Sequence, residues 1–367
     1  MEITKPILDS LWIAEKDLRG LLQLRLRLFL TVILPVLMLF IFNFRFGGIP
    51  LSEAPVAVAI SDNGSEGFEL ARMLDGTSEI AVIPAASSEM AVRLLRDGEV
   101  YAAITVPEGF SKNIRAGVES TVELDLDDSN PLLAASIRSV VERVIGQFNE
   151  KMHPQLVKAA SSFLYGTGLS YVPFLASGLV AMTTMFGAIL QSLSIVWERS
   201  LRTLDRLLVA PVRSVSIMTG KILAGMMAGL GQALIILGTA NLLFDVNLRN
   251  LPVILLVVFV SSFAFTGVGV LISCVAKDPR EAAVYNQFLN WPMVFISGVF
   301  FPVEALPSWL QSAARLAPLT YSVEALRAIM IKGRETSFIA LDMFVLICFA
   351  ISTLYLGSRL LMRSETK

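Results

Sequence analysis

Residues 250–276 read NLPVILLVVFVSSFAFTGVGVLISCVA and contain no charged side chain. A helix needs about 20 mainly apolar residues to cross the roughly 30 Å hydrocarbon core of a bilayer, so this stretch predicts a membrane-spanning helix. The same reasoning applies to the other long uncharged stretches, which are 28–44, 159–197, 222–244, 282–303 and 343–358. The last is long enough only if Asp342 lies at its edge, which extends the apolar run back to Ser337. The sequence therefore predicts an α-helical polytopic membrane protein with six transmembrane helices.

The overall composition favours the same class of protein. Of the 367 residues, 54% are hydrophobic and 17% are charged, whereas soluble domains have about 25% charged residues. A formal net charge of −1 excludes a broad basic surface, so nucleic acid is not expected as a partner. The chain has two cysteines and one histidine, so we expect neither a disulfide framework nor a metal site.

Lysine and arginine in the short loops predict the orientation in the membrane. Basic residues are concentrated before the first predicted helix, after the second and fourth helices, and in the C-terminal tail. The connection 245–250 has one basic residue, and the connection 304–335 has four, which weakens the contrast without reversing it. We expect a multi-pass protein of the plasma (inner) membrane with both termini in the cytoplasm.

The soluble parts are predicted from their patterns. Residues 50–165, between the first two predicted helices, alternate short apolar runs with amphipathic ones, which is typical of an inserted extracytoplasmic α/β domain. We expect strands over 56–60, 80–83, 102–106 and 122–126, and helices over 67–74, 88–96, 110–116 and 131–149. Residues 1–27 predict an interfacial lead helix on the cytoplasmic side, followed by the first membrane helix, 28–46, while 171–361 contain the other five.

The segment 198–213 is the most informative one on the cytoplasmic side. It begins ERSLRTLDRLLVAPV (198–212), with leucines at helical spacing and a proline that ends the predicted helix. A short helix of this kind suits a separate motor that pushes on the membrane helices, or alternatively a helix lying on the membrane surface. The chain itself has no phosphate-binding loop, because Gly220-Lys221 is followed by Ile222 instead of serine or threonine. We expect no enzyme activity from it.

Several motifs, in this order and spacing, carry a resemblance that spans nearly the whole chain. They are KDLRGLL (16–22), TVPEGF (105–110), DSN (128–130), the segment 198–212 continuing into 216–221, SGVFFPVEALPSWL (297–310) and APLTYSVEALR (317–327). Together they resemble the permeases of type-2 ATP-binding-cassette transporters. The large domain between the first two membrane helices is similar to that of the drug-export branch of this family.

The resemblance implies a permease subunit that moves a hydrophobic or amphipathic drug, lipid or glycolipid outward. It implies a cassette ATPase subunit as partner, with ATP and Mg on that partner and no cofactor in this chain, and a second copy or a paralogous permease. Residues 303–335 would form an outer re-entrant hairpin that shapes the exit together with the inserted domain, and membrane lipid would be a further partner. The coupling helix 198–213 would contact the ATPase through Glu198, Arg199, Arg202, Leu204, Leu207 and Pro211.

The translocation path would lie between the two copies, along the second and fifth helices. Polar residues that could face it are Thr183, Thr184, Gln191, Gln287 and Asn290, although they could equally bond between helices. Gly225 and Gly229 permit close helix contact, either within the chain or between copies. Two alternative functions remain: a mechanotransmission permease that acts on an outer partner through the α/β domain, and a membrane-tethered ligand receptor.

Overall fold

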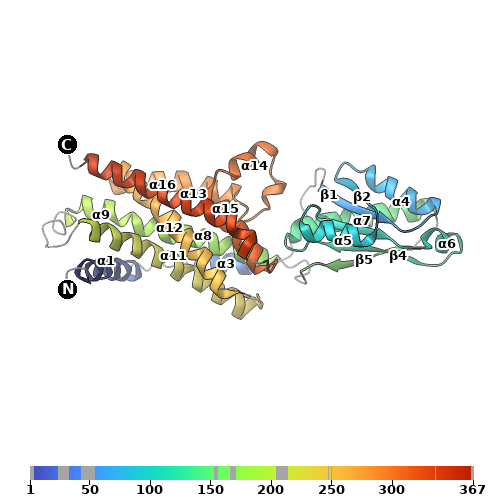
Figure 1. The fold of residues 1–367 in the computed structure, drawn as a ribbon, viewed down its shortest axis with the longest axis horizontal. Helices are drawn as coiled ribbons and strands as arrows, with labels where there is room; N and C mark the ends of the chain where they lie inside the picture. The colour runs from blue at the N-terminus through green and yellow to red at the C-terminus, as the bar shows by residue number, and fades with distance from the viewer. Residues whose placement is uncertain are drawn as a thin grey trace. The chain divides into compact units, whose positions relative to one another are not determined.

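The computed structural model describes residues 4–23, 33–42, 54–152, 156–165, 171–203, 214–246, 248, 250–334 and 336–364. The chain divides into two compact units, a helical unit of residues 1–43 and 175–367 and an α/β unit of residues 44–174. The α/β unit is thus inserted into the sequence of the helical unit (Figure 1).

The helices of the helical unit follow the apolar stretches of the sequence. The long ones are α8 (Val172–Ser192), α11 (Ser214–Phe244), α12 (Leu251–Val275), α13 (Pro279–Ile296) and α16 (Ala340–Ser364). The others are α1 (Thr4–Gln23), α3 (Leu34–Phe42), α9 (Ser194–Ser200), η2 (Val303–Ala305), α14 (Ser308–Ala314), α15 (Pro318–Met330) and η3 (Thr336–Ile339). Helix α12 packs against α11, α15 and α16, and α1 packs against α11.

Within the described residues, four helical segments are long and apolar enough to cross a membrane: Val172–Ser200, Ser216–Phe244, Leu251–Val275 and Thr336–Gly357. They correspond to the second, third, fourth and sixth predicted transmembrane helices. Of the first, only α3 falls within the described residues. The fifth corresponds to α13, which is helical but has Arg280 and Glu281 in its first turn. The count of six therefore stays a prediction.

Small residues allow close packing of the membrane helices. A Cβ atom built on Gly229 of α11 would lie 2.7 Å from Ser262 Oγ of α12 and 2.8 Å from the Thr184 carbonyl oxygen of α8. Gly229 therefore lies on a seam within the chain, which favours the first of the two interpretations of the Gly225–Gly229 spacing.

The α/β unit contains a five-stranded sheet in the order β2-β1-β3-β4-β5. Strand β1 pairs in parallel with β2 and β3, β4 is antiparallel to β3, and β5 is parallel to β4. The strands are β1 (Ala54–Ile60), β2 (Ile80–Ala85), β3 (Ala102–Val106), β4 (Ser120–Leu126) and β5 (Val157–Phe163). The helices are α4 (Ser65–Asp75), α5 (Ser88–Asp97), α6 (Phe110–Arg115) and α7 (Pro131–Met152).

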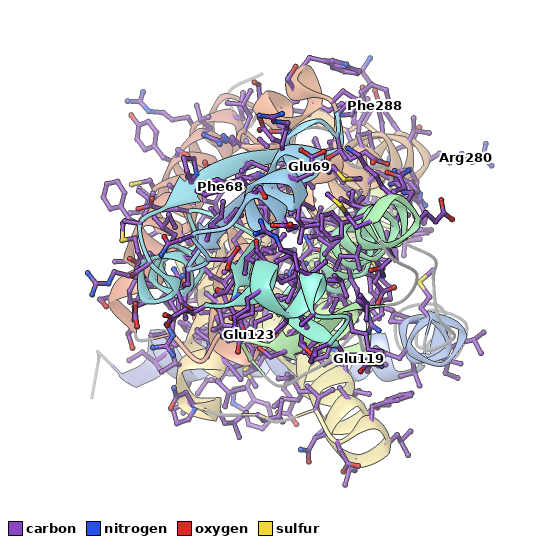
Figure 2. All side chains as sticks on the ribbon, turned by 90° about the vertical axis from the view of Figure 1, so that its right-hand side faces the viewer. Phe68, Glu69, Glu119, Glu123, Arg280 and Phe288 are labelled. Carbon is purple, nitrogen blue, oxygen red and sulfur yellow. The ribbon has the colours of Figure 1, made fainter. Side chains whose placement is uncertain are left out.

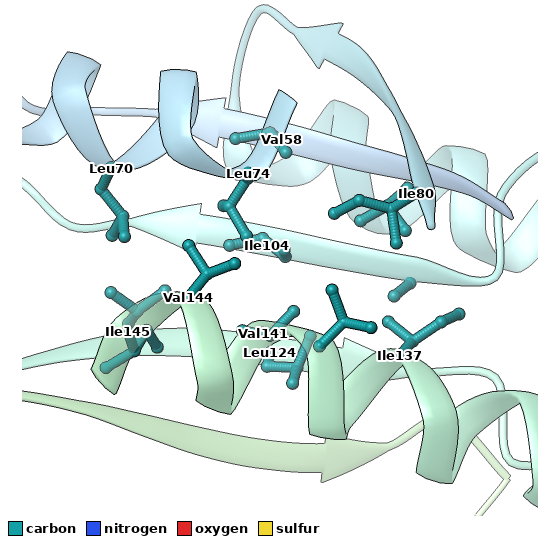
Figure 3. Close-up of a cluster of buried hydrophobic side chains, with 14 of the residues drawn as sticks. Val58, Leu70, Leu74, Ile80, Ile104, Leu124, Ile137, Val141, Val144 and Ile145 are labelled. Carbon is teal, nitrogen blue, oxygen red and sulfur yellow. The ribbon is translucent and has the colours of Figure 1, made fainter. Parts of the chain in front are cut away.

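Alternation along β1 explains the two layers of helices. Val56 and Val58 face the main core, where they meet side chains of α4 and α7, and Figure 3 shows Val58, Leu70, Leu74 and Val141 gathered there. The small residues Ala57 and Ala59 face the other side of the sheet, which α5 covers with Ala91 and Leu95. The four predicted strands and four predicted helices of this unit are confirmed. Strand β5 was not predicted, because its small residues show no clear apolar pattern.

Candidate functional site: a buried cluster of charges

Four charged side chains from three helices meet in the helical unit. The ammonium of Lys221, in α11, lies 3.1 Å from Asp17 Oδ2 of α1 and 2.8 Å from Glu198 Oε2 of α9. The ammonium of Lys16 lies 2.5 Å from Glu198 Oε1 and 3.2 Å from Asp17 Oδ1. Each lysine thus contacts both carboxylates, and each carboxylate contacts both lysines. Lys221 also lies 3.2 Å from the hydroxyl of Ser194. We call Lys16, Asp17, Glu198 and Lys221 the charge cluster.

The cluster is deeply buried on one side and open on the other. The side chains of Lys221 and Asp17 are 1% and 3% exposed, whereas those of Glu198 and Lys16 are 15% and 47% exposed. A buried charge is tolerated when a partner of opposite sign and hydrogen bonds replace water. The four formal charges sum to zero, so removal of a single one leaves the cluster with a net charge beside side chains that are 1% and 3% exposed.

Helix α1 packs against α11 through one narrow face. Ser10, Ile13, Ala14 and Asp17 are buried and recur at helical spacing. Gly220 permits this contact, since a Cβ atom there would lie 2.7 Å from the Ser10 carbonyl oxygen. The opposite face of α1 exposes Ile7, Leu8, Leu11 and Trp12. The predicted amphipathic lead helix is thus confirmed as a helix, and its place on a membrane leaflet stays a prediction.

Local electrostatics keep the exposed lysine charged. Although partial burial lowers the pKa of Lys16, the hydrogen bond to Glu198 and the charges of Asp17 and Glu198 outweigh it and raise the pKa above its ordinary value. Lys16 therefore stays protonated across the neutral pH range.

Helix α9 presents its two adjacent charged residues to different partners. Glu198 belongs to the charge cluster, while Arg199 donates a hydrogen bond from Nη2 to the carbonyl oxygen of Ala276, just beyond the end of α12. Arg202 is exposed and has a left-handed backbone conformation, with φ of 54°. Of the predicted coupling helix 198–213, residues 198–200 belong to α9 (Ser194–Ser200) and residues 201–202 form a turn, while 204–213 lie outside the described residues, so this helix stays a prediction. Leu204, Leu207 and Pro211 lie outside the described residues.

The residues predicted for a translocation path differ in burial and in hydrogen bonding. Thr183 and Thr184 are buried, and their hydroxyls donate to carbonyl oxygens of their own helix at 2.8 Å and 2.6 Å. Asn290 is also buried and donates to Asn286 Oδ1 at 2.7 Å, whereas Gln287 is exposed on α13. Gln191 lies in α8, and its side chain is outside the described part of the chain.

Around Gln287, α13 exposes a set of large apolar side chains. Phe288 is 81% exposed, and Val284, Trp291 and Phe295 are exposed beside it. Figure 2 shows Phe288 at the surface of the unit. Only a stripe of this helix, which includes Asn286 and Asn290, is buried within the chain. An apolar face of this extent is suited to lipid, to a second protein chain or to a hydrophobic cargo.

Sequence reasoning identified Glu198 but not the rest of the charge cluster. The signals were present: Asp17 is the only acidic residue on the buried face of α1, and Lys221 directly precedes a long uncharged stretch. Their pairing was hidden, because 204 positions separate Asp17 from Lys221.

Comparisons with known proteins agree with this architecture. The family described as ABC-2 family transporter protein matches residues 26–359. The probable multidrug ABC transporter permease YbhR of Escherichia coli K12 is 24% identical over 356 residues, which cover 94% of this chain and 95% of the relative. YbhS of the same strain, described likewise, is 22% identical over 337 residues and 88% of each chain. Nodulation protein J of Rhizobium leguminosarum bv. trifolii is 32% identical over 208 residues, covering 53% of this chain and 76% of its own.

Proposed function

The chain belongs to the ABC-2 family of transporter proteins, and on this premise we propose that it is the permease subunit of an exporter energised by a separate cassette ATPase. The cargo would be a hydrophobic or amphipathic molecule (a drug, a lipid or a glycolipid) that leaves the cytoplasm or the inner leaflet. The protein would lie in the plasma membrane with both termini in the cytoplasm, and would work with a second copy or a paralogous permease.

The charge cluster is the observation that carries this proposal. It ties α9 to the start of the candidate span Ser216–Phe244 and to α1. The segment that the family resemblance assigns to the ATPase, 198–213, begins within α9 and continues beyond it. A displacement imposed on that segment would reach α1 and α11 through Glu198, because a balanced buried cluster resists being pulled apart. ATP hydrolysis on the partner subunit would thus move the membrane helices of this chain.

The exposed apolar face of α13 supports the second copy. This helix carries Gln287 together with Phe288 and Trp291 on an exposed surface. Two such faces opposite each other would form an apolar path with a few polar groups, which suits an amphipathic cargo.

The test is reconstitution with and without the ATPase. We expect the purified chain to hydrolyse no ATP, and inside-out vesicles containing chain and ATPase to accumulate a lipophilic dye or a fluorescent phospholipid only when ATP is added. Glu198→Gln should lower this uptake. The matched control is Lys158→Met, which removes an exposed ion pair with Glu119 in the α/β unit. Uptake that persists without the ATPase, or ATP hydrolysis by the chain alone, would contradict the proposal.

A further inference from the structure

Arg199 binds the end of a neighbouring helix within its own chain. Its side chain is partly buried, and its guanidinium donates to the carbonyl oxygen of Ala276, a residue that is 1% exposed. The last carbonyl groups of a helix have no partner within the helix, and an arginine side chain is well suited to bind one. Helix α9 also packs against both α12 and α13. Arg199 thus attaches α9 to the junction between these two helices.

The junction that Arg199 holds is continuous with the first turns of α13. Asp278 caps α13, because its Oδ1 accepts hydrogen bonds from the backbone amides of Arg280 and Glu281, each at 2.8 Å. Glu281 accepts in turn from the backbone amide of Lys277 at 2.7 Å, and from the hydroxyl of Tyr285 at 2.5 Å. These bonds make the residues from Lys277 to Tyr285 one connected group, so a movement of Ala276 is passed to the start of α13.

The far part of α13 carries the residues predicted to line the cargo path. Gln287 and Phe288 are exposed, and Asn290 follows within one turn. In Figure 2, Phe288 and Arg280 both extend from this helix at the surface of the unit. Two adjacent residues of α9 therefore connect this helix to different partners. Glu198 contacts α1 and α11, and Arg199 contacts the junction before α13.

We propose that Arg199 is a positioning residue that transmits the displacement of α9 to α13, and that it does not contact the ATPase itself. This inference rests on the proposed function, in which the ATPase acts on the segment after α9. A displacement of α9 would then reach the other helices by two routes. One runs through Glu198 to α1 and α11, and the other runs through Arg199 to α13.

A purely structural role for Arg199, in which it only caps α12, makes a different prediction. A cap alone would change the stability of the protein without changing which helices respond to nucleotide. The distinguishing readout is therefore the nucleotide-dependent movement of α13 compared with that of α11.

The experiment measures these movements by electron–electron double resonance on the full chain in complex with its ATPase in nanodiscs. In a Cys274→Ser, Cys348→Ser background, spin labels at positions 288 and 344 report on α13 relative to α16. Labels at positions 227 and 344 report on α11 relative to α16. All of these positions are exposed in the native chain. Labelled chains are diluted with unlabelled ones, and distances are compared between the nucleotide-free state and the state trapped with ATP and vanadate.

In the wild type, both distances should shift on trapping. Arg199→Met keeps a long side chain but has no hydrogen-bond donor, so it should abolish the α13 shift and retain the α11 shift. Arg199→Lys, which has a donor, should restore the α13 shift. Asp278→Ala should abolish the α13 shift as well, while Asp278→Asn, which keeps a capping oxygen, should not. Arg19→Met, at an exposed arginine of α1, is the control for loss of a charge.

An α13 shift of wild-type size in Arg199→Met would overturn the inference and leave the proposed function intact. Loss of both shifts in that variant would also overturn it, because the two routes would then not be separate. If Arg199→Met does not fold, the two Asp278 variants provide the test. Equal α13 shifts in Asp278→Ala and Asp278→Asn would contradict the route from Arg199 to α13. The absence of any shift in the wild type would contradict the proposed function itself.

Discussion

Replacement of Lys221 by methionine removes the most deeply buried positive charge of the cluster with little change in side-chain volume. Asp17 and Glu198 would keep Lys16 as their common partner, and the cluster would carry one net negative charge. Because the Asp17 side chain is 3% exposed, water cannot take the place of the lost ammonium. Breaking a buried ion pair by removing one partner costs about 3–5 kcal/mol, and we expect Lys221→Met to destabilise the helical unit by that amount.

Two further variants test whether charge balance is the cause. Lys16→Met removes a lysine that is 47% exposed, so solvent screens the loss and the cost should be about 0–1 kcal/mol. The double variant Asp17→Asn, Lys221→Met restores neutrality and leaves the Lys16–Glu198 pair. It should be more stable than Lys221→Met alone, with a coupling free energy toward the upper end of the range of about 0.5–3 kcal/mol found for contacting residues.

The assay is unfolding of the purified chain by SDS in mixed micelles, followed by tryptophan fluorescence. All four tryptophans lie in the helical unit, so the signal does not report on the α/β unit. Equal stability of Lys221→Met and Lys16→Met would refute the claim that the cost depends on the burial of the lost charge. The claim that charge balance is the cause is also refuted if the effects of Asp17→Asn and Lys221→Met simply add, since the four charges would then not act as one cluster.

Three more predictions concern other parts of the chain. Gly220→Ala places a methyl group against the backbone of α1, so it should destabilise the helical unit by about 1–3 kcal/mol in the same assay, whereas Gly231→Ala, which has open space, should not. The hydrogen bond from Arg115 lowers the pKa of Glu66 from 4.5 to about 2, so its contribution to stability is present above pH 4.5 and is lost as the pH falls through about 2. Pepsin should therefore cleave Glu66→Gln faster than wild type at pH 4 and at nearly the same rate at pH 2, and equal rates at pH 4 would speak against this. Arg202→Glu should reduce co-purification of the ATPase without reducing membrane insertion; undiminished co-purification would remove this residue from the coupling surface.

Apolar length and alternation were sufficient to predict most of the architecture. The uncharged run 250–276 became α12, and the short apolar or alternating runs became β1, β3 and β4, because burial of apolar side chains decides these elements. The ordered motifs also predicted the family correctly. Strand β5 was hidden because VKAASSF consists mostly of small residues without a clear apolar pattern, and its place depends on pairing with β4.

The candidate site was predictable only in part, since charge on an amphipathic segment does not show which partner it meets. Glu198 and Arg199 were both assigned to the ATPase from sequence. In the structure, Glu198 contacts Lys16 and Lys221, and Arg199 contacts the end of α12. Such contacts depend on how helices that are distant in the sequence pack together. The periodicity within one helix does not show which other helix it packs against.

Transport energised by a separate ATPase requires that the segment after α9 faces the cytoplasm, where the ATPase can act on it. Cysteine labelling with a membrane-impermeant maleimide in right-side-out vesicles tests this directly, in a Cys274→Ser, Cys348→Ser background. Leu201 and Glu123 are both exposed in the structure, so a cysteine at either position can react. We expect that Glu123→Cys is labelled in intact vesicles and that Leu201→Cys is labelled only after permeabilisation. Labelling of Leu201→Cys from outside in intact vesicles would contradict this expectation.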